Sequence, residues 1–236
     1  MCSLSLVATM GDISVVMAAF NAASTIARSL TSVLDQTLPP FRVIVIDDGS
    51  TDHTVDIARG FGDVEVVSID HAGPGAALNA GFALVDSEFV AVLDSDDLWP
   101  RDRLAVHREA FGDAPSADIV LGTTLNVTDT SGFESVDDVE QAVSATGSEP
   151  VMSRLPGAMT VRTRALPLLG PIRTDVAHAA TTAWISSPAA QALNTVEIDS
   201  IALYRMIHGN NMGVTDAAQA RQDWLLLVRQ RIQEQR

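Results

Sequence analysis

The stretch Val43-Ile-Val-Ile-Asp-Asp-Gly-Ser-Thr-Asp52 decides the fold class that the sequence predicts. Its first four residues are all apolar, which is typical of a strand covered on both faces in a parallel sheet. The strand then stops in acidic and turn-forming residues. A second stretch, Phe89-Val-Ala-Val-Leu-Asp-Ser-Asp-Asp97, has the same design. In open parallel sheets ligands bind at the carboxyl ends of the strands, so these acids are expected to face a ligand.

Short apolar runs alternate with segments of helical period around these two stretches. The alternation is typical of strands joined by crossover helices. It predicts an α/β fold whose mostly parallel central sheet is flanked by helices. Strands are expected at 13–18, 43–46, 64–69, 89–93, 118–127, 158–161 and 196–207, and helices at 21–36, at 74–85 and from Pro100 onward.

Residues 12–213 are expected to form one domain, after an N-terminal extension over 1–11. Residues 128–153 are acidic and short of periodic apolar side chains, which predicts a mobile loop. A second interpretation is that this loop acts as a lid. Residues 214–236 are expected to form a C-terminal amphipathic helix. Docking on its own domain is the default for such a helix, and a second subunit or a membrane surface is the alternative. A homodimer therefore stays open.

The charge balance of the chain argues against one class of partner. With 30 acidic and 15 basic side chains, the chain has a formal net charge of −15, and its field repels nucleic acids. A nucleotide ligand is an anion too, and would need a divalent cation held by carboxylates.

Cysteine usage and hydropathy indicate the cellular compartment of the protein. The single cysteine, Cys2, excludes an intramolecular disulfide and fits a reducing compartment. No apolar run approaches the roughly 20 residues that span a bilayer, and the residues before Gly11 lack the pattern of a secretory signal. The sequence therefore predicts a cytoplasmic protein that is not integral to a membrane.

Asp94, Asp96 and Asp97 are candidate ligands of Mn²⁺ or Mg²⁺. These ions favour oxygen ligands and are usually bound by one or two carboxylates, with substrate phosphates completing the shell. Three carboxylates this close repel one another unless a cation or protons intervene. The alternative is that they cap the following helix, because Asp is favoured at helix N-termini. Asp47 and Asp48 have a similar alternative as turn residues.

Four ordered motifs resemble the family 2 glycosyltransferases of GT-A fold. They are Ser14-Val-Val-Met-Ala-Ala-Phe-Asn21, Val45-Ile-Asp-Asp-Gly-Ser-Thr-Asp52, Gly73-Pro-Gly-Ala-Ala-Leu-Asn-Ala-Gly81 and Val92-Leu-Asp-Ser-Asp-Asp-Leu-Trp-Pro100. Tyr204-Arg-Met-Ile-His-Gly-Asn-Asn-Met212 resembles a later segment of that family. The likeness is dense over 12–112 and resumes over 156–213. It implies a nucleotide-sugar-binding half over 12–112 and an acceptor-side half over 113–213.

The resemblance also implies roles for single residues. Phe20 and Asp48 are expected to contact the nucleobase, with Ala18 in the same donor-facing loop, and Asp96 is expected to lie by the ribose. Asp97 and His208 are expected to bind the metal, Mn²⁺ or Mg²⁺, although a histidine in an exposed loop is more often a plain loop residue. The implied donor is a nucleoside-diphosphate-sugar, with a UDP-sugar as first choice. Arg205 is an alternative partner for phosphate charge, or else a solvated surface group.

The chain departs from the family pattern where the catalytic base is expected. Family 2 enzymes invert the anomeric centre and usually carry a carboxylate just before an aromatic residue. Here the matching stretch, Asp175-Val-Ala-His-Ala-Ala-Thr-Thr-Ala-Trp184, has no acid near Trp184. Asp175 or His178 is therefore the candidate base, unless the acceptor needs little help or transfer is inefficient. Leu78 and Ala18 also replace the usual arginine and proline.

Three functions follow, of which a metal-assisted glycosyltransferase acting on an unidentified acceptor is preferred. The second is a non-catalytic or weakly active protein that binds nucleotide-sugars, suggested by Ala180 and Ala183 at the expected acid positions. The third is a nucleotidyltransferase, which also uses a parallel sheet and paired acids. The chain lacks the glycine-rich basic phosphate loop that such enzymes tend to carry, which weakens this reading.

Overall fold

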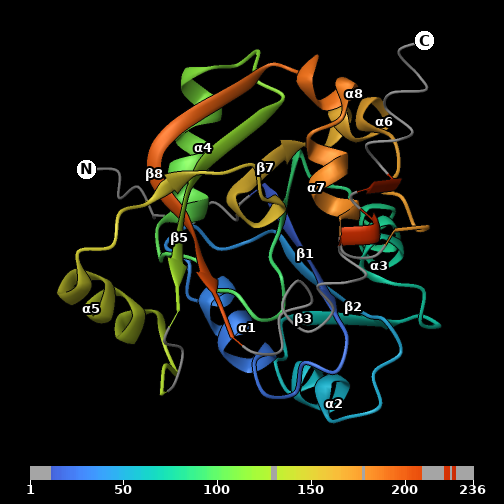
Figure 1. Ribbon diagram of the computed structural model, residues 1–236, viewed down its shortest axis with the longest axis vertical. Coiled ribbons are helices and arrows are strands. Elements are labelled where there is room, and N and C mark those ends of the chain that lie inside the picture. The colour runs from blue at the N-terminus through green and yellow to red at the C-terminus, as the bar shows by residue number, and fades with distance from the viewer. Residues whose placement is uncertain (1–11, 129–131, 177–178, 209–220, 224, 227–236) are drawn as a thin grey trace, which may run out of the picture.

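The computed structural model describes residues 12–128, 132–176, 179–208, 221–223 and 225–226. Within them, eight strands form a mixed, mostly parallel sheet in the order β3-β2-β1-β4-β7-β5-β6, and β8 pairs with β5 off this path (Figure 1). This confirms the predicted α/β class. The strands are β1 (Ile13–Ala19), β2 (Arg42–Asp47), β3 (Val64–Ser68), β4 (Phe89–Val92), β5 (Ile119–Val127), β6 (Val151–Met152), β7 (Met159–Arg162) and β8 (Thr195–Met206).

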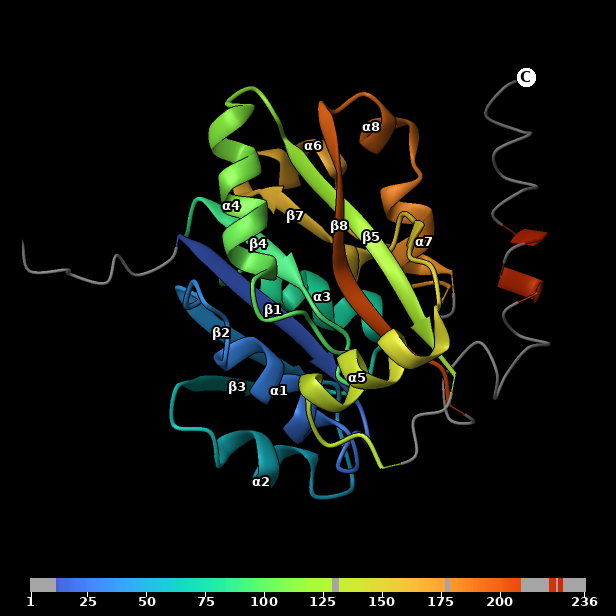
Figure 2. The ribbon, with the colours of Figure 1, turned by 90° about the vertical axis from the view of Figure 1, so that its left-hand side faces the viewer.

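Helices cover both faces of the sheet, as Figure 2 shows, with α1 and α4 on one face and α3 and α7 on the other. The apolar strands β1, β2 and β4 are buried throughout their centres because helices lie on both sides of them. The helices are α1 (Ile26–Leu34), α2 (Thr54–Arg59), α3 (Pro74–Phe82), α4 (Arg103–Asp113), α5 (Val136–Thr146), α6 (Leu166–Leu169), α7 (Ala180–Ile185) and α8 (Pro188–Gln191), with 3-10 turns η1 (Pro156–Ala158) and η2 (Thr163–Ala165). None of the helices in the described part of the chain combines the length and apolarity needed to cross a bilayer.

The predicted loop over 128–153 is wrong for much of its length, because it contains α5 and β6. Ser135 and Asp138 form a capping box at the start of α5, and Gly147 ends it in the left-handed conformation. Val136 and Val139 are buried in a second apolar cluster with β5, β8 and Leu98. Val136, Val139 and Val143 stand at the helical spacing i, i+3 and i+7, which the sequence interpretation missed. Packing on the sheet stabilises so short a helix.

The predicted strand over 158–161 is present as β7, but its place in the sheet was not foreseen. It is inserted antiparallel between β4 and β5, with Val90 opposite Val161 and Val120 opposite Thr160. The expected C-terminal helix over 214–236 lies almost entirely outside the described residues.

Gly81 lets α3 approach β1 closely, and its replacement tests that packing. A Cβ at Gly81 would lie 2.3 Å from Cγ1 of the buried Val16. Alanine favours a helix over glycine by about 1 kcal/mol, whereas overpacking a core costs about 1–3 kcal/mol. Gly81→Ala is therefore expected to lower the free energy of unfolding by up to about 2 kcal/mol in urea denaturation. Gly62→Ala is the control, since no atom lies within 4 Å of that Cβ, and a Gly81→Ala protein more stable than the unchanged one would contradict the close contact.

Candidate functional site

The two acid-ended strands finish at the same edge of the sheet. β1 lies between β2 and β4 and is parallel to both. The pairing continues just beyond the strands, where the Asp48 N–H donates to the Ala19 carbonyl at 2.8 Å and the Leu93 N–H donates to the Val16 carbonyl at 3.2 Å. The expectation that both acidic stretches reach a common edge is therefore confirmed.

Asp97 points inward from the acidic loop. It is 4% exposed, and its Oδ1 accepts a hydrogen bond from the Met206 N–H at 2.8 Å. The next residue, Leu98, pairs with Tyr204 through two backbone hydrogen bonds of 3.1 and 2.9 Å. Burial, together with the charge of Asp96, raises the pKa of Asp97 well above its usual value. Asp97 therefore fastens the end of β8 to the acidic loop.

Asp96 lies beside His208, which the end of β8 brings to the acidic loop. The distance from His208 Nε2 to Asp96 Oδ2 is 3.1 Å. Both side chains are partly buried, with 19% of the His208 side chain and 29% of the Asp96 side chain exposed. The structure thus brings together two of the predicted site residues that are 112 positions apart in the sequence.

A carboxylate and an imidazole suit a divalent cation that is also bound by phosphate oxygens. Mg²⁺ and Mn²⁺ are commonly held by one or two protein ligands, with the substrate completing the shell. Across the described ranges, no group of three or more His, Cys, Asp or Glu side chains is placed to hold a metal. Asp97 is buried and bonded to the Met206 N–H, whereas Asp96 and His208 are partly exposed and lie side by side. The predicted role of Asp97 as a ligand stays a prediction.

Asp48 is closed off from solvent at the end of β2, with 2% of its surface exposed. Its Oδ1 accepts from the Ala72 N–H at 2.8 Å, and its Oδ2 accepts from the Gly73 N–H at 2.9 Å. His71 Nδ1 is 2.9 Å from Oδ2 as well. The carboxylate thus holds the loop between β3 and α3 against the end of β2. Its predicted contact with a nucleobase is not visible in this arrangement and stays a prediction.

Phe20 is 46% exposed next to Asp48 and stacks on His71. The two ring centroids are 4.2 Å apart and the rings are inclined by 22°. An exposed aromatic ring at the carboxyl edge of a sheet is suited to stacking with a base. Sequence reasoning missed His71, and the only available signal was its position directly after the third strand.

Backbone geometry holds the loops around Asp48 in place. Gly49 has a φ of +76°, and a Cβ there would lie 3.1 Å from the backbone nitrogen of His71. Asn21, with a φ of 49°, accepts a hydrogen bond from the Thr51 N–H at 2.9 Å. Ala18 lies near the end of β1, opposite Ile46, which agrees with the strand predicted over 13–18 and not with the donor-facing loop that the resemblance implied. Its contact with the donor stays a prediction.

The Gly73–Gly81 motif joins α3 to the segment that carries Asp175. The Asn79 side chain donates to the Ile172 carbonyl at 2.8 Å and accepts from the Ile172 N–H at 2.9 Å. A Cβ at Gly75 would lie 2.5 Å from the Arg173 carbonyl oxygen. These residues therefore fix the backbone just before the candidate base, which explains their spacing along one helix.

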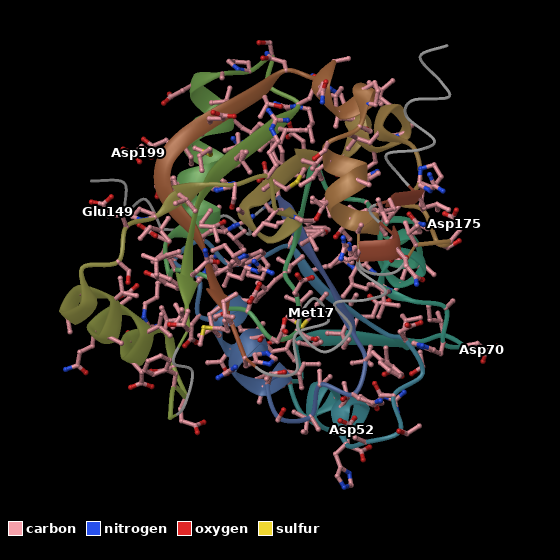
Figure 3. All side chains as sticks on the ribbon, in the orientation of Figure 1. Met17, Asp52, Asp70, Glu149, Asp175 and Asp199 are labelled. Atoms are coloured by element: carbon pink, nitrogen blue, oxygen red, sulfur yellow. The ribbon has the colours of Figure 1, made fainter. Side chains whose placement is uncertain are left out.

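Asp175 lies at the outer surface beside α3 (Figure 3), and its side chain is 59% exposed. Arg173 donates to both of its carboxylate oxygens, at 2.9 and 2.5 Å. The Arg173 guanidinium lowers the pKa of Asp175, which makes this carboxylate a weaker base. His178 lies outside the described residues. The identity of the base therefore stays a prediction for both residues.

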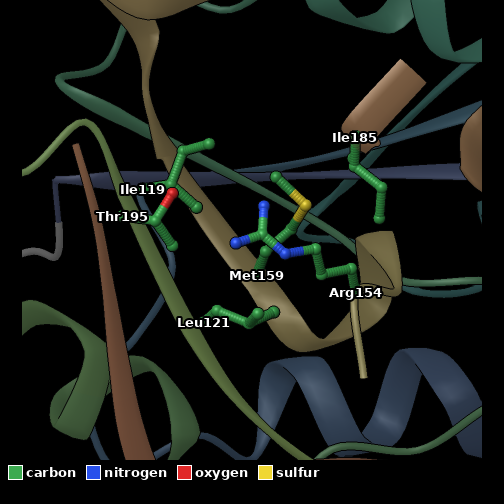
Figure 4. A pocket seen from close by; sticks show the side chains of 6 residues that line it. All are labelled: Ile119, Leu121, Arg154, Met159, Ile185 and Thr195. Carbon is green, nitrogen blue, oxygen red and sulfur yellow. The ribbon is translucent and has the colours of Figure 1, made fainter. Parts of the chain in front are cut away.

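A small cavity beneath α7 is not a candidate for the site. It measures about 10 Å³ and is lined by Ile119, Leu121, Arg154, Met159, Ile185 and Thr195 (Figure 4). Such a space holds about one water molecule. Ile119 and Thr195 also begin β5 and β8, so the cavity lies toward the edge of the sheet away from His208.

The chain is similar to known proteins over most of its length. Residues 14–173 match the glycosyl transferase family 2. An uncharacterised glycosyltransferase of Nostoc is 32% identical over 149 residues, which cover 58% of this chain and 46% of the Nostoc protein.

Two solved structures share the architecture. TarS residues 1–349 of S. aureus, in complex with UDP-GlcNAc, superpose with a TM-score of 0.68 at 22% identity, covering 84% of this chain and 59% of TarS. A mannosyltransferase of Pyrobaculum calidifontis, in complex with GDP-Man and Mn²⁺, gives 0.65 at 21% identity, covering 96% and 66%. At such identities the likeness shows the fold, which is of the predicted GT-A type. The chain spans less than two thirds of the length of these three proteins.

Proposed function

We propose, from the premise that the chain belongs to glycosyl transferase family 2, that it transfers a sugar from a nucleoside-diphosphate donor to an acceptor. One observation carries this proposal: the aromatic and carboxylate groups of Phe20 and Asp48 and the Asp96–His208 pair flank the end of β1 at one edge of the sheet. A nucleotide-sugar needs apolar, polar and cation-binding groups side by side, for its base, its diphosphate and its sugar.

The nucleotide end of the donor is proposed to lie at Phe20 and Asp48. Phe20 offers an exposed ring for stacking, and Asp48 is an acceptor for a base N–H. The solved relatives bind UDP-GlcNAc in one case and GDP-Man in the other. A UDP-sugar is our first choice of donor.

The diphosphate end is proposed to lie at Asp96 and His208, which would hold Mn²⁺ or Mg²⁺ together. When bound, such an ion neutralises the charge that develops on the departing diphosphate. Asp97 supports this end indirectly, because its bond to the Met206 N–H fixes the strand end that leads to His208. The donor site thus draws on both proposed halves of the chain, 12–112 and 113–213.

Calorimetric titration tests the proposal. UDP, GDP, CDP and ADP are titrated into the protein with Mn²⁺, with Mg²⁺ and with EDTA. We expect binding of UDP in the presence of Mn²⁺ with a dissociation constant in the micromolar range, which corresponds to roughly −8 kcal/mol, and at least about tenfold weaker binding in EDTA. Failure of every nucleotide to bind with either metal would overturn the proposal.

Hydrolysis distinguishes an enzyme from a protein that only binds the donor. The non-catalytic alternative predicts UDP-sugar binding with no release of UDP above background, whether or not candidate acceptors are added. We expect slow release of UDP without an acceptor, because water can replace the acceptor hydroxyl. The acceptor, a homodimer and a cytoplasmic location remain predictions.

A further inference from the structure

The Asp48 carboxylate can meet a nucleobase only if a group that now covers it moves away. Asp48 is 2% exposed. Two of its contacts come from the backbone N–H groups of Ala72 and Gly73. The remaining contact recorded among described residues is His71 Nδ1, at 2.9 Å from Oδ2. Among the polar contacts that Asp48 makes with described residues, His71 is thus the side chain that a rotation about its own bonds could move away.

The proton on the His71 ring is fixed by its surroundings. Nδ1 lies 3.0 Å from the backbone carbonyl oxygen of Asp48 as well as 2.9 Å from Oδ2. A carbonyl oxygen accepts hydrogen bonds and never donates them. Nδ1 must therefore carry the hydrogen. The ring N–H hydrogen-bonds to the Asp48 carbonyl oxygen, with the carboxylate Oδ2 2.9 Å from Nδ1, while the ring face stacks on Phe20 at a centroid distance of 4.2 Å.

A nucleobase at this site would make a similar stack on Phe20 and would bring an N–H to the same carboxylate. Uracil also has a flat ring that stacks on an aromatic side chain, and its N3–H can donate to a carboxylate. The His71 side chain is 58% exposed, so rotating it outward requires little repacking. The imidazole thus has the shape, the donor and the freedom of a replaceable stand-in for a base.

We propose that His71 fills the nucleobase position when no donor is bound, so that a base enters by replacing the imidazole. This proposal rests on the proposed function. Once the imidazole has moved away, uracil through N3–H and guanine through N1–H can each donate to the Asp48 carboxylate. Cytosine and adenine carry an unprotonated ring nitrogen at the corresponding position and leave the carboxylate without that hydrogen bond.

Competition of this kind lowers the apparent affinity for the donor. When the binding-competent state is only a fraction of the population, the observed dissociation constant is the intrinsic one divided by that fraction. If the imidazole covers Phe20 and Asp48 in about nine molecules of ten, binding is weakened about tenfold. Removing the ring should therefore tighten binding, which is the opposite of what removal of a direct contact does.

The test compares UDP binding to His71→Ala, His71→Phe and the unchanged protein by calorimetry with Mn²⁺. His71→Ala is expected to bind UDP about three- to tenfold more tightly. His71→Phe keeps a ring on Phe20 but has no N–H for Asp48, and is expected to fall between the two. His53→Ala is the matched control, because His53 is an exposed histidine whose recorded partner is Asp56 at 3.5 Å. It should leave the affinity unchanged.

The other nucleotides supply a second readout. GDP, CDP and ADP should each gain affinity in His71→Ala by the same factor as UDP, because that factor depends only on how often the imidazole covers the site in the free protein. Weaker or unchanged UDP binding by His71→Ala, with thermal melting showing a folded protein, would overturn the role of His71 while leaving the proposed function intact. If the unchanged protein binds no nucleotide at all, the proposed function fails and this inference fails with it.

Discussion

Replacing Asp96 by alanine is expected to lower kcat/KM for sugar transfer by about 10²- to 10³-fold. Asp96 Oδ2 lies 3.1 Å from His208 Nε2, and this pair is our proposed cation site. Removing its carboxylate takes away charge stabilisation aimed at the departing diphosphate. Steady-state kinetics over a range of Mn²⁺ concentrations measures the loss, and calorimetry should show that Mn²⁺ no longer strengthens UDP binding.

Asp97→Asn is the matched variant for Asp96→Ala. The amide of asparagine keeps an oxygen that accepts from the Met206 N–H, the hydrogen bond that Asp97 makes at 2.8 Å. Because Asp97 is buried and its pKa is raised by burial, the neutral amide should be tolerated there. We expect Asp97→Asn to lose less activity than Asp96→Ala, and its UDP binding still to be strengthened by Mn²⁺. If Asp97→Asn instead abolishes that dependence while Asp96→Ala keeps it, the ligand is Asp97, as the resemblance alone implies.

Replacing Trp99 by alanine is expected to lower the free energy of unfolding by about 3–5 kcal/mol. Trp99 follows the acidic loop and is fully buried, and its Nε1–H donates to the Gly157 carbonyl at 2.9 Å. The Arg103 guanidinium lies over its ring, 3.9 Å from the centroid. Arg103 is itself 1% exposed, and within the described residues its Nε and Nη1 have no hydrogen-bond partner. The ring and the Met159 carbonyl, which accepts from Arg103 Nη2 at 2.6 Å, thus compensate for a buried cation, and urea denaturation at neutral pH measures the loss of the ring.

Trp99→Phe separates the ring face from the indole N–H. Phenylalanine keeps an aromatic face for Arg103 and leaves the Gly157 carbonyl without its donor, at a cost of about 1–3 kcal/mol. We therefore expect it to be clearly more stable than Trp99→Ala. A loss below about 1 kcal/mol in Trp99→Ala would show that Arg103 and the acidic loop are held by other contacts.

Packing also decided which parts of the sheet could be foreseen. β2 and β4 could be predicted because four consecutive apolar residues are typical of a strand buried on both faces. α5 was missed because so short a helix depends on the packing of its valines against Leu98, β5 and β8. The antiparallel insertion of β7 between β4 and β5 is likewise a pairing choice among distant segments, which no local pattern encodes.

The sequence by itself determined the α/β class, the family, and the placement of acids at the ends of two buried strands, because these depend on local runs of residues. Only the tertiary structure decided how those acids are used. It turned Asp97 inward onto Met206, brought His208 to Asp96 across 112 residues, and closed Asp48 beneath His71. The physical reason is that side-chain direction and charge pairing depend on neighbours that are distant in the chain and close in space.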